Sequence, residues 1–96
     1  MLTGKQKRQL RGLGHALKPV ILIGKRELDQ SVIDETGQAL ASHELIKVKL
    51  LESCLLDRHE AADTLAEATG SDIAQVLGRT FLLYRPADPP RMALPA

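Results

Sequence analysis

The chain is organised around the stretch Leu17-Lys18-Pro19-Val20-Ile21-Leu22-Ile23-Gly24-Lys25-Arg26-Glu27. Its middle part, residues 19–23, is apolar and rich in β-branched side chains, which favours a short strand that is buried on both faces and central in its sheet. A 3.6-residue period of apolar positions begins directly after Gly24. Residues 24–27 are therefore predicted to form the loop between this strand and a helix.

This loop brings two adjacent cations, Lys25 and Arg26, to the start of the predicted helix. The first N–H groups of a helix lack intrahelical partners and carry the positive end of the macrodipole, so they attract phosphate groups. We therefore expect the backbone of a nucleic acid to lie against Gly24, Lys25 and Arg26.

A first helix is predicted to begin at Thr3, because Thr3 and Gln6 have the spacing of a capping box. One side of this helix is apolar, and the opposite side is basic or titratable. The apolar side carries Leu10, Leu13 and Leu17, and the other carries Lys7, Arg8, Arg11 and His15. A face that is merely solvated remains the alternative to a binding face. Gly12 and Gly14 each weaken a helix interior, and close packing is one reason to keep them.

The rest of the chain predicts a helix over 28–43, a strand over 45–51, a helix over 58–69, and two strands over 73–77 and 80–85. In the 45–51 strand, Lys47 and Lys49 occupy the wet face, where they either bind a polyanion or protect the edge from pairing. Asp57 and Glu60 form a second capping box, and Gly70 ends that helix. Gly78-Arg79 suits a type II′ hairpin with Arg79 at an exposed tip.

These elements predict a single α/β (α+β) domain with the order α-β-α-β-α-β-β and a four-stranded mixed sheet. Strands joined through a helix are expected to be parallel, whereas the closing hairpin is antiparallel. The domain should occupy residues 1–86. The proline-rich tail, residues 87–96, is expected to be flexible.

The net charge of +1 conceals a marked segregation along the chain. Residues 1–26 contain seven cations and no acid, whereas residues 27–75 contain eleven acids and three cations. This distribution suggests one surface for polyanions and another that repels them.

Several classes of function find no support in the sequence. His15, His43 and His59 lie in different predicted elements, and Cys54 has no CxxC partner, so neither a metal site nor a catalytic constellation is predicted. We also expect no cofactor, no small-molecule substrate and no membrane partner, because nucleotide-binding fingerprints and long apolar runs are lacking. The lone cysteine fits a cytoplasmic location.

Four segments in order resemble the CRM domain, the chloroplast RNA splicing and ribosome maturation module, in its stand-alone prokaryotic YhbY-like form. They are residues 5–19, 20–24, 43–49 and 78–86. The resemblance implies an RNA-binding domain that is similar in fold to the C-terminal domain of translation initiation factor three. It also implies ribosomal RNA and the precursor of the large ribosomal subunit as partners.

Members of that family typically carry a Gly-x-x-Gly loop after the first strand, comparable with the KH loop that clamps RNA backbone. Here Gly24 is the first glycine, and Glu27 replaces the second. We therefore expect Lys25 and Arg26 to carry more of the contact. The predicted RNA surface consists of Lys7, Arg8, Arg11, Gly24, Lys25, Arg26, Lys47, Lys49 and Arg79.

Two other functions remain compatible with the sequence. A small α/β domain with basic loops could serve as an architectural protein that binds duplex DNA. The acidic second and third helices could instead form the working surface of a protein-interaction module. With only Phe81 and Tyr84 as aromatic residues, base stacking is expected to contribute little, so recognition should rest on phosphates and 2′-hydroxyls.

Overall fold

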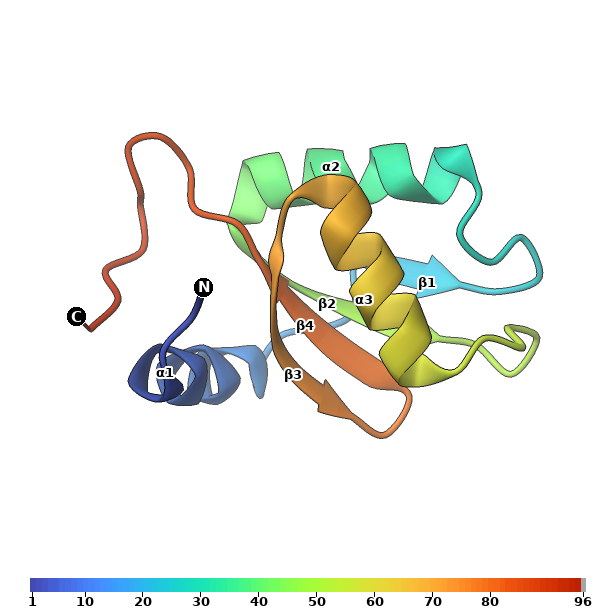
Figure 1. Cartoon of the computed structure of the whole chain (residues 1–96), viewed down its shortest axis with the longest axis horizontal. Coiled ribbons are helices and arrows are strands. Elements are labelled where there is room, and N and C mark those ends of the chain that lie inside the picture. The colour runs from blue at the N-terminus through green and yellow to red at the C-terminus, as the bar shows by residue number, and fades with distance from the viewer. Residues whose placement is uncertain (96) are drawn as a thin grey trace.

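The computed structural model describes residues 1–95, in which three helices and one four-stranded sheet follow each other in the predicted order (Figure 1). The elements are α1 (Gly4–Gly14), β1 (Ile21–Ile23), α2 (Gln30–His43), β2 (Leu45–Leu50), α3 (Arg58–Thr69), β3 (Asp72–Leu77) and β4 (Thr80–Tyr84). The predicted fold class is confirmed.

The sheet has the strand order β1-β2-β4-β3. Strand β1 pairs in parallel with β2, and the other two pairs are antiparallel, so the mixed sheet follows the expected rules. Gly78 in the β3–β4 turn has a φ of 59°, as the first central position of the predicted type II′ turn requires.

The two faces of the sheet are covered to different extents. On the first, which we call the covered face, α2 and α3 pack over side chains of all four strands, and Phe81, Val48 and Ile23 are among the residues buried there. On the second, which we call the half-covered face, α1 inserts Leu10 against Leu45, Leu82 and Tyr84, together with Ala74. Figure 1 shows α2 and α3 on one side of the sheet and α1 on the other.

The prediction that the first strand is central and buried on both faces is wrong. Strand β1 is three residues long and lies at the sheet edge. Ile21 and Ile23 point into the covered face, but Leu22 on the other face is 55% exposed, because α1 does not extend over it. A run of β-branched residues gives no information on how far a helix reaches across the sheet.

The second helix begins at Gln30, two residues later than predicted, because Asp29 acts as its N-cap. The Asp29 carboxylate accepts a hydrogen bond from the Val32 N–H at 2.9 Å. The loop after β1 therefore covers residues 24–29.

Helix α1 begins with the predicted Thr3–Gln6 capping box but ends at Gly14, so Leu17 lies beyond it. Of its three predicted inward leucines only Leu10 is buried, while Leu13 and Leu17 are 46% and 37% exposed. The close packing expected at the glycines is confirmed for Gly14, where a Cβ would overlap the side chain of Leu82. Gly12 has open space around it.

Candidate nucleic-acid interface

The three cations predicted on the first helix, Lys7, Arg8 and Arg11, are all exposed on α1. None of them shares a salt bridge with an acid of residues 1–95. This face of α1 thus presents three charges to solvent, within the acid-free part of the sequence.

The loop after β1 exposes Lys25 and Arg26 at the tip of a tight turn. The Glu27 N–H donates to the Gly24 carbonyl at 3.0 Å and closes the turn. Glu27 has a φ of 53°, in the left-handed region that glycine adopts more readily than other residues. The backbone thus keeps a conformation suited to glycine at the position where glutamate replaces it.

The loop has acidic surroundings, which changes the expected electrostatics. A shallow depression beside it is lined by Arg26 together with the carboxylates Glu27, Asp29 and Glu60. The Val32 N–H of the first turn of α2 already donates to the Asp29 carboxylate. Asp29 therefore occupies part of the helix N-terminus, and the exposed Lys25 and Arg26 remain the main attraction for a phosphate.

Lys47 and Lys49 project from β2 into the half-covered face, because the alternate residues Ile46, Val48 and Leu50 are buried in the opposite face. Lys49 is exposed and Lys47 is partly buried. In the sheet register, Lys49 is the partner of Leu22 on β1. Both lysines are thus available on a face that no second layer fully covers.

Arg79 is exposed in the β3–β4 turn, as predicted, but its guanidinium makes contacts within the protein. Its Nε donates to the Leu50 carbonyl at 3.1 Å, and its NH2 group donates to the Leu51 carbonyl at 2.7 Å. Arg79 therefore ties the end of β2 to the hairpin. A contact with RNA would have to share its guanidinium.

The structure does not gather all these cations in one place. Helix α1 and the 24–29 loop lie toward opposite ends of the long axis in Figure 1, in a molecule 38 Å long. Lys47 and Lys49 on β2 lie between them in the sheet. A polyanion that contacted the whole set would have to extend along the molecule.

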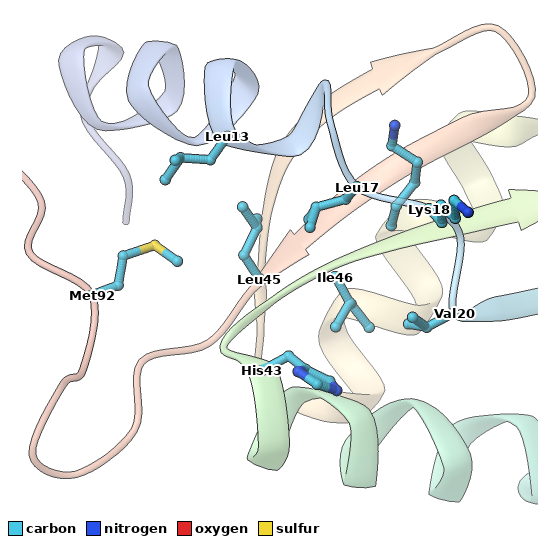
Figure 2. A pocket seen from close by; sticks show the side chains of 9 residues that line it. Leu13, Leu17, Lys18, Val20, His43, Leu45, Ile46 and Met92 are labelled. Atoms are coloured by element: carbon cyan, nitrogen blue, oxygen red, sulfur yellow. The ribbon is translucent and has the colours of Figure 1, made fainter.

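A hollow of about 430 Å³ lies on the half-covered face, where the chain leaves α1 and enters β1 (Figure 2). Sequence reasoning did not find it. Its lining combines apolar side chains with three cationic or titratable ones and includes no carboxylate. The lining residues are Leu13, Leu17, Lys18, Val20, His43, Leu45, Ile46, Lys47 and Met92. No signal for it was present in the sequence, because the helical period assigned Leu13 and Leu17 to the inward side of the first helix, and only the structure shows that they are partly exposed.

The C-terminal segment 86–95 passes from β4 toward α1, and Glu44 holds its first part. This carboxylate is 3% exposed, and its Oε2 accepts from the N–H groups of Ala87 at 2.7 Å and Arg91 at 3.2 Å. The Ala87 hydrogen bond, and less strongly those of Arg91 and Met92 and the Arg91 charge, lower the pKa of Glu44 despite its desolvation. Met92 thereby comes to line the hollow. The flexibility expected of residues 87–96 stays a prediction.

Within residues 1–95, no group of three or more His, Cys, Asp or Glu side chains is placed to hold a metal ion. Among the same residues, none of the helices has the length and apolar character required to cross a membrane.

We next compared the chain with known protein families. The model of the CRS1/YhbY (CRM) domain matches residues 2–85. The chain belongs to the CRM domain family. The resemblance that residues 5–19, 20–24, 43–49 and 78–86 indicated is thus confirmed across the whole folded unit.

Individual CRM relatives agree over most of their length. The chain is 40% identical to "Probable RNA-binding protein YqeI" of Bacillus subtilis, with 88% of each chain covered. It is 35% identical to an RNA-binding protein of Haemophilus influenzae, over 98% of this chain and 95% of the relative. The solution structure of SAV1595 from Staphylococcus aureus superposes with a TM-score of 0.83 at 42% identity, covering 99% of this chain and 100% of the other.

Proposed function

We propose that this CRM protein binds RNA by contacting the phosphate backbone of the RNA, and that the protein itself catalyses no reaction. The observation that carries this proposal is the 24–27 turn. It exposes Lys25 and Arg26 together and keeps a left-handed backbone at Glu27, where family members typically have the second glycine. The names of the relatives, which describe RNA-binding proteins, support the same function.

The proposed RNA surface is extended. It runs from Lys7, Arg8 and Arg11 on α1, past Lys47 and Lys49, to the loop residues Gly24, Lys25 and Arg26, with Arg79 at its margin. Because the two ends lie far apart on the molecule, the ligand should be an RNA that follows the sheet edge. We further propose ribosomal RNA in precursors of the large subunit as this ligand, which implies a cytoplasmic site of action.

The direct test is RNA binding as a function of salt. If about five phosphates are contacted, the slope of log K against log salt should be about −3.5 to −4.5. Replacing both Lys25 and Arg26 with alanine should weaken binding to all RNA sequences and reduce the slope by roughly two units. An unchanged slope would remove the loop from the interface, and equal affinity for matched DNA and RNA duplexes would favour the architectural DNA-binding alternative.

A charge-matched control separates a local contact from a general loss of positive charge. Arg26→Gln and Arg85→Gln each remove one cation, and Arg85 lies outside the proposed surface, where it donates to the carbonyls of Thr69 on α3 and Gly37 on α2. Only Arg26→Gln should lower the salt slope, by about one unit. Similar losses from both variants would mean that binding follows net charge.

The proposal on ribosome assembly needs a test of its own. In a sucrose gradient of a cell extract, the protein should sediment with precursors of the large subunit at low salt and leave them at raised salt. Sedimentation only with free protein at both salt concentrations would contradict this part and leave RNA binding itself untouched.

A further inference from the structure

We propose that the hollow between α1 and the start of β2 binds one unpaired nucleotide of the RNA, with its base against the leucines and its phosphate near Lys18 and Lys47. This inference rests on the proposed function. It adds a subsite for a base to an interface that was expected to recognise backbone alone.

The hollow exists because β1 is much shorter than β2. Pro19 has no N–H for the ladder, and the pairing of β1 with β2 begins only with the Val20 N–H, which donates to the Lys47 carbonyl at 3.0 Å. The first residues of β2, Leu45 and Ile46, therefore have β4 on one side and no strand on the other.

Three segments form the walls around this gap. Leu13 and Leu17 descend from α1 and the chain that follows it, Met92 approaches from the C-terminal segment, and His43 stands at the end of α2 (Figure 2). The volume of about 430 Å³ lies within the range of small-ligand sites, roughly 300–1,000 Å³. Leu17 and Val20 are 37% and 47% exposed, so apolar surface is left uncovered here.

The chemistry of the lining selects the occupant. The uncovered apolar side chains favour a ligand with an apolar surface, because both surfaces are then removed from water. The adjacent Lys18 and Lys47 favour a negative charge on the same ligand. An inorganic phosphate would leave the leucines uncovered, and a neutral apolar ligand would leave the lysines without a partner. A nucleotide satisfies both, because every base has an apolar face and every phosphate a charge.

The hollow adjoins the proposed RNA surface, which indicates that the bound nucleotide is part of an RNA strand. The extended chain from Val20 at the hollow through β1 to Gly24 in the loop spans four residues, or roughly 13 Å. Lys49 lies between these two points, beside Leu22 in the register. The sheet edge thus presents cations at the hollow, along β2 and in the loop, in the order in which an extended strand would pass them.

The test is a cycle that combines removal of a base with removal of the apolar wall. Binding of a short single-stranded RNA is compared with binding of the same RNA carrying one abasic nucleotide at each position in turn. Val20→Asn removes apolar lining without changing charge. Leu22→Asn is the matched control, because Leu22 follows two residues later on the same face and is similarly exposed but does not line the hollow. Leu17→Asn, outside any regular element, repeats the test should Val20→Asn unfold.

With the natural chain and with Leu22→Asn, one abasic position should weaken binding about tenfold, near the lower end for a stacked base because the wall is aliphatic. In Val20→Asn the abasic position should cause no further loss of affinity, because the substitution has already removed the apolar contact with the base. The methyl signals of Leu13 and Leu17 should shift with single-stranded RNA and stay in place with a duplex.

The remaining outcomes separate this proposal from the proposed function. An equal abasic penalty in all three proteins would place the base elsewhere, and methyl signals that never move with RNA would leave the hollow to a protein partner. Either result overturns the subsite while RNA binding stands. Failure of every RNA to bind overturns both proposals, even if adenosine monophosphate alone shifts the methyl signals.

Discussion

The two faces of the sheet are built in different ways. On the covered face, side chains from four strands and two helices form one continuous core, which includes Ile23, Leu40, Leu65 and Phe81. On the half-covered face, α1 contributes a single large buried side chain, Leu10, and leaves the edge strand β1 exposed. The stability of the fold should therefore come mainly from the covered face. The half-covered face keeps surface available for a ligand.

The same difference explains where the cations lie. A lysine on a strand can stay charged only where water or a partner reaches it, because burying an unpaired charge is costly. Lys47 and Lys49 therefore require an incompletely covered face. As a result, α1 is held on the sheet by few contacts. Substitutions at these contacts test whether the half-covered face is less stable than the covered face.

The largest effect is expected at Leu10. Leu10→Ala removes a fully buried side chain and should cost about 2–5 kcal/mol of unfolding free energy. Because Leu10 is the only large buried side chain of α1, native-state hydrogen exchange should show loss of protection in α1 before α2 and α3. Leu13→Ala, one turn away and half exposed, is the control and should stay within about 0.5 kcal/mol. Uniform loss of protection in all three helices would show that the two faces unfold as one unit.

The next effect concerns the two glycines of α1. Gly14→Ala should cost about 1–3 kcal/mol, because its Cβ would overlap Leu82 and push the helix from the sheet. Gly12→Ala meets open space and should stabilise the helix by up to about 1 kcal/mol. Denaturant titration of both variants measures this contrast. If both were stabilising, α1 would be free to shift on the half-covered face.

A smaller effect is expected at the loop, which is anchored on the covered face through Leu28. Glu27→Gly should stabilise the protein by up to about 1 kcal/mol, because glycine adopts the positive φ without strain. The gain in stability should raise the midpoint temperature of thermal unfolding and leave the hydrogen exchange of the α1 amides unchanged. RNA binding should also tighten, since a carboxylate beside Lys25 and Arg26 is removed. Weaker RNA binding would assign Glu27 a contact of its own.

The local elements could be predicted from the sequence because their signals are local. The capping residues Thr3 and Asp57, the left-handed Gly70 and the Gly78 turn act over three or four neighbouring residues, and the structure contains each of them. The order of helices and strands follows from hydrophobic periodicity for the same reason. Family membership followed from four short segments in the correct order.

The features that could not be predicted depend on which helices and strands contact each other in the fold. The edge position of β1 depends on strand order, and the exposure of Leu13, Leu17 and Leu22 depends on the distance that α1 covers. The contacts of Arg79 with two carbonyls of β2 and its following loop join residues nearly thirty positions apart. Charge counted along the sequence likewise missed Glu60 of α3, which lines the same depression as Arg26 although it is far from it in the sequence.

The smallest expected effect is confined to the C-terminal segment, which closes one side of the half-covered face. Since the pKa of Glu44 is lowered in the fold, its hold on Ala87 and Arg91 should be fully present above the ordinary glutamate pKa of about 4.3. It should be lost as the pH falls through the lowered pKa, because a protonated carboxyl accepts these N–H groups less well. Exchange protection of the two amides, corrected for intrinsic rates, should therefore stay constant at neutral pH and fall only below the ordinary glutamate pKa of about 4.3. Glu44→Gln should lose it at every pH, whereas Glu35→Gln on the exposed side of α2 should behave like the natural chain. Should protection of Ala87 stay constant with pH and in Glu44→Gln, other contacts would hold Met92 at the hollow, such as the hydrogen bond that the Gln9 side chain donates to the Ala93 carbonyl.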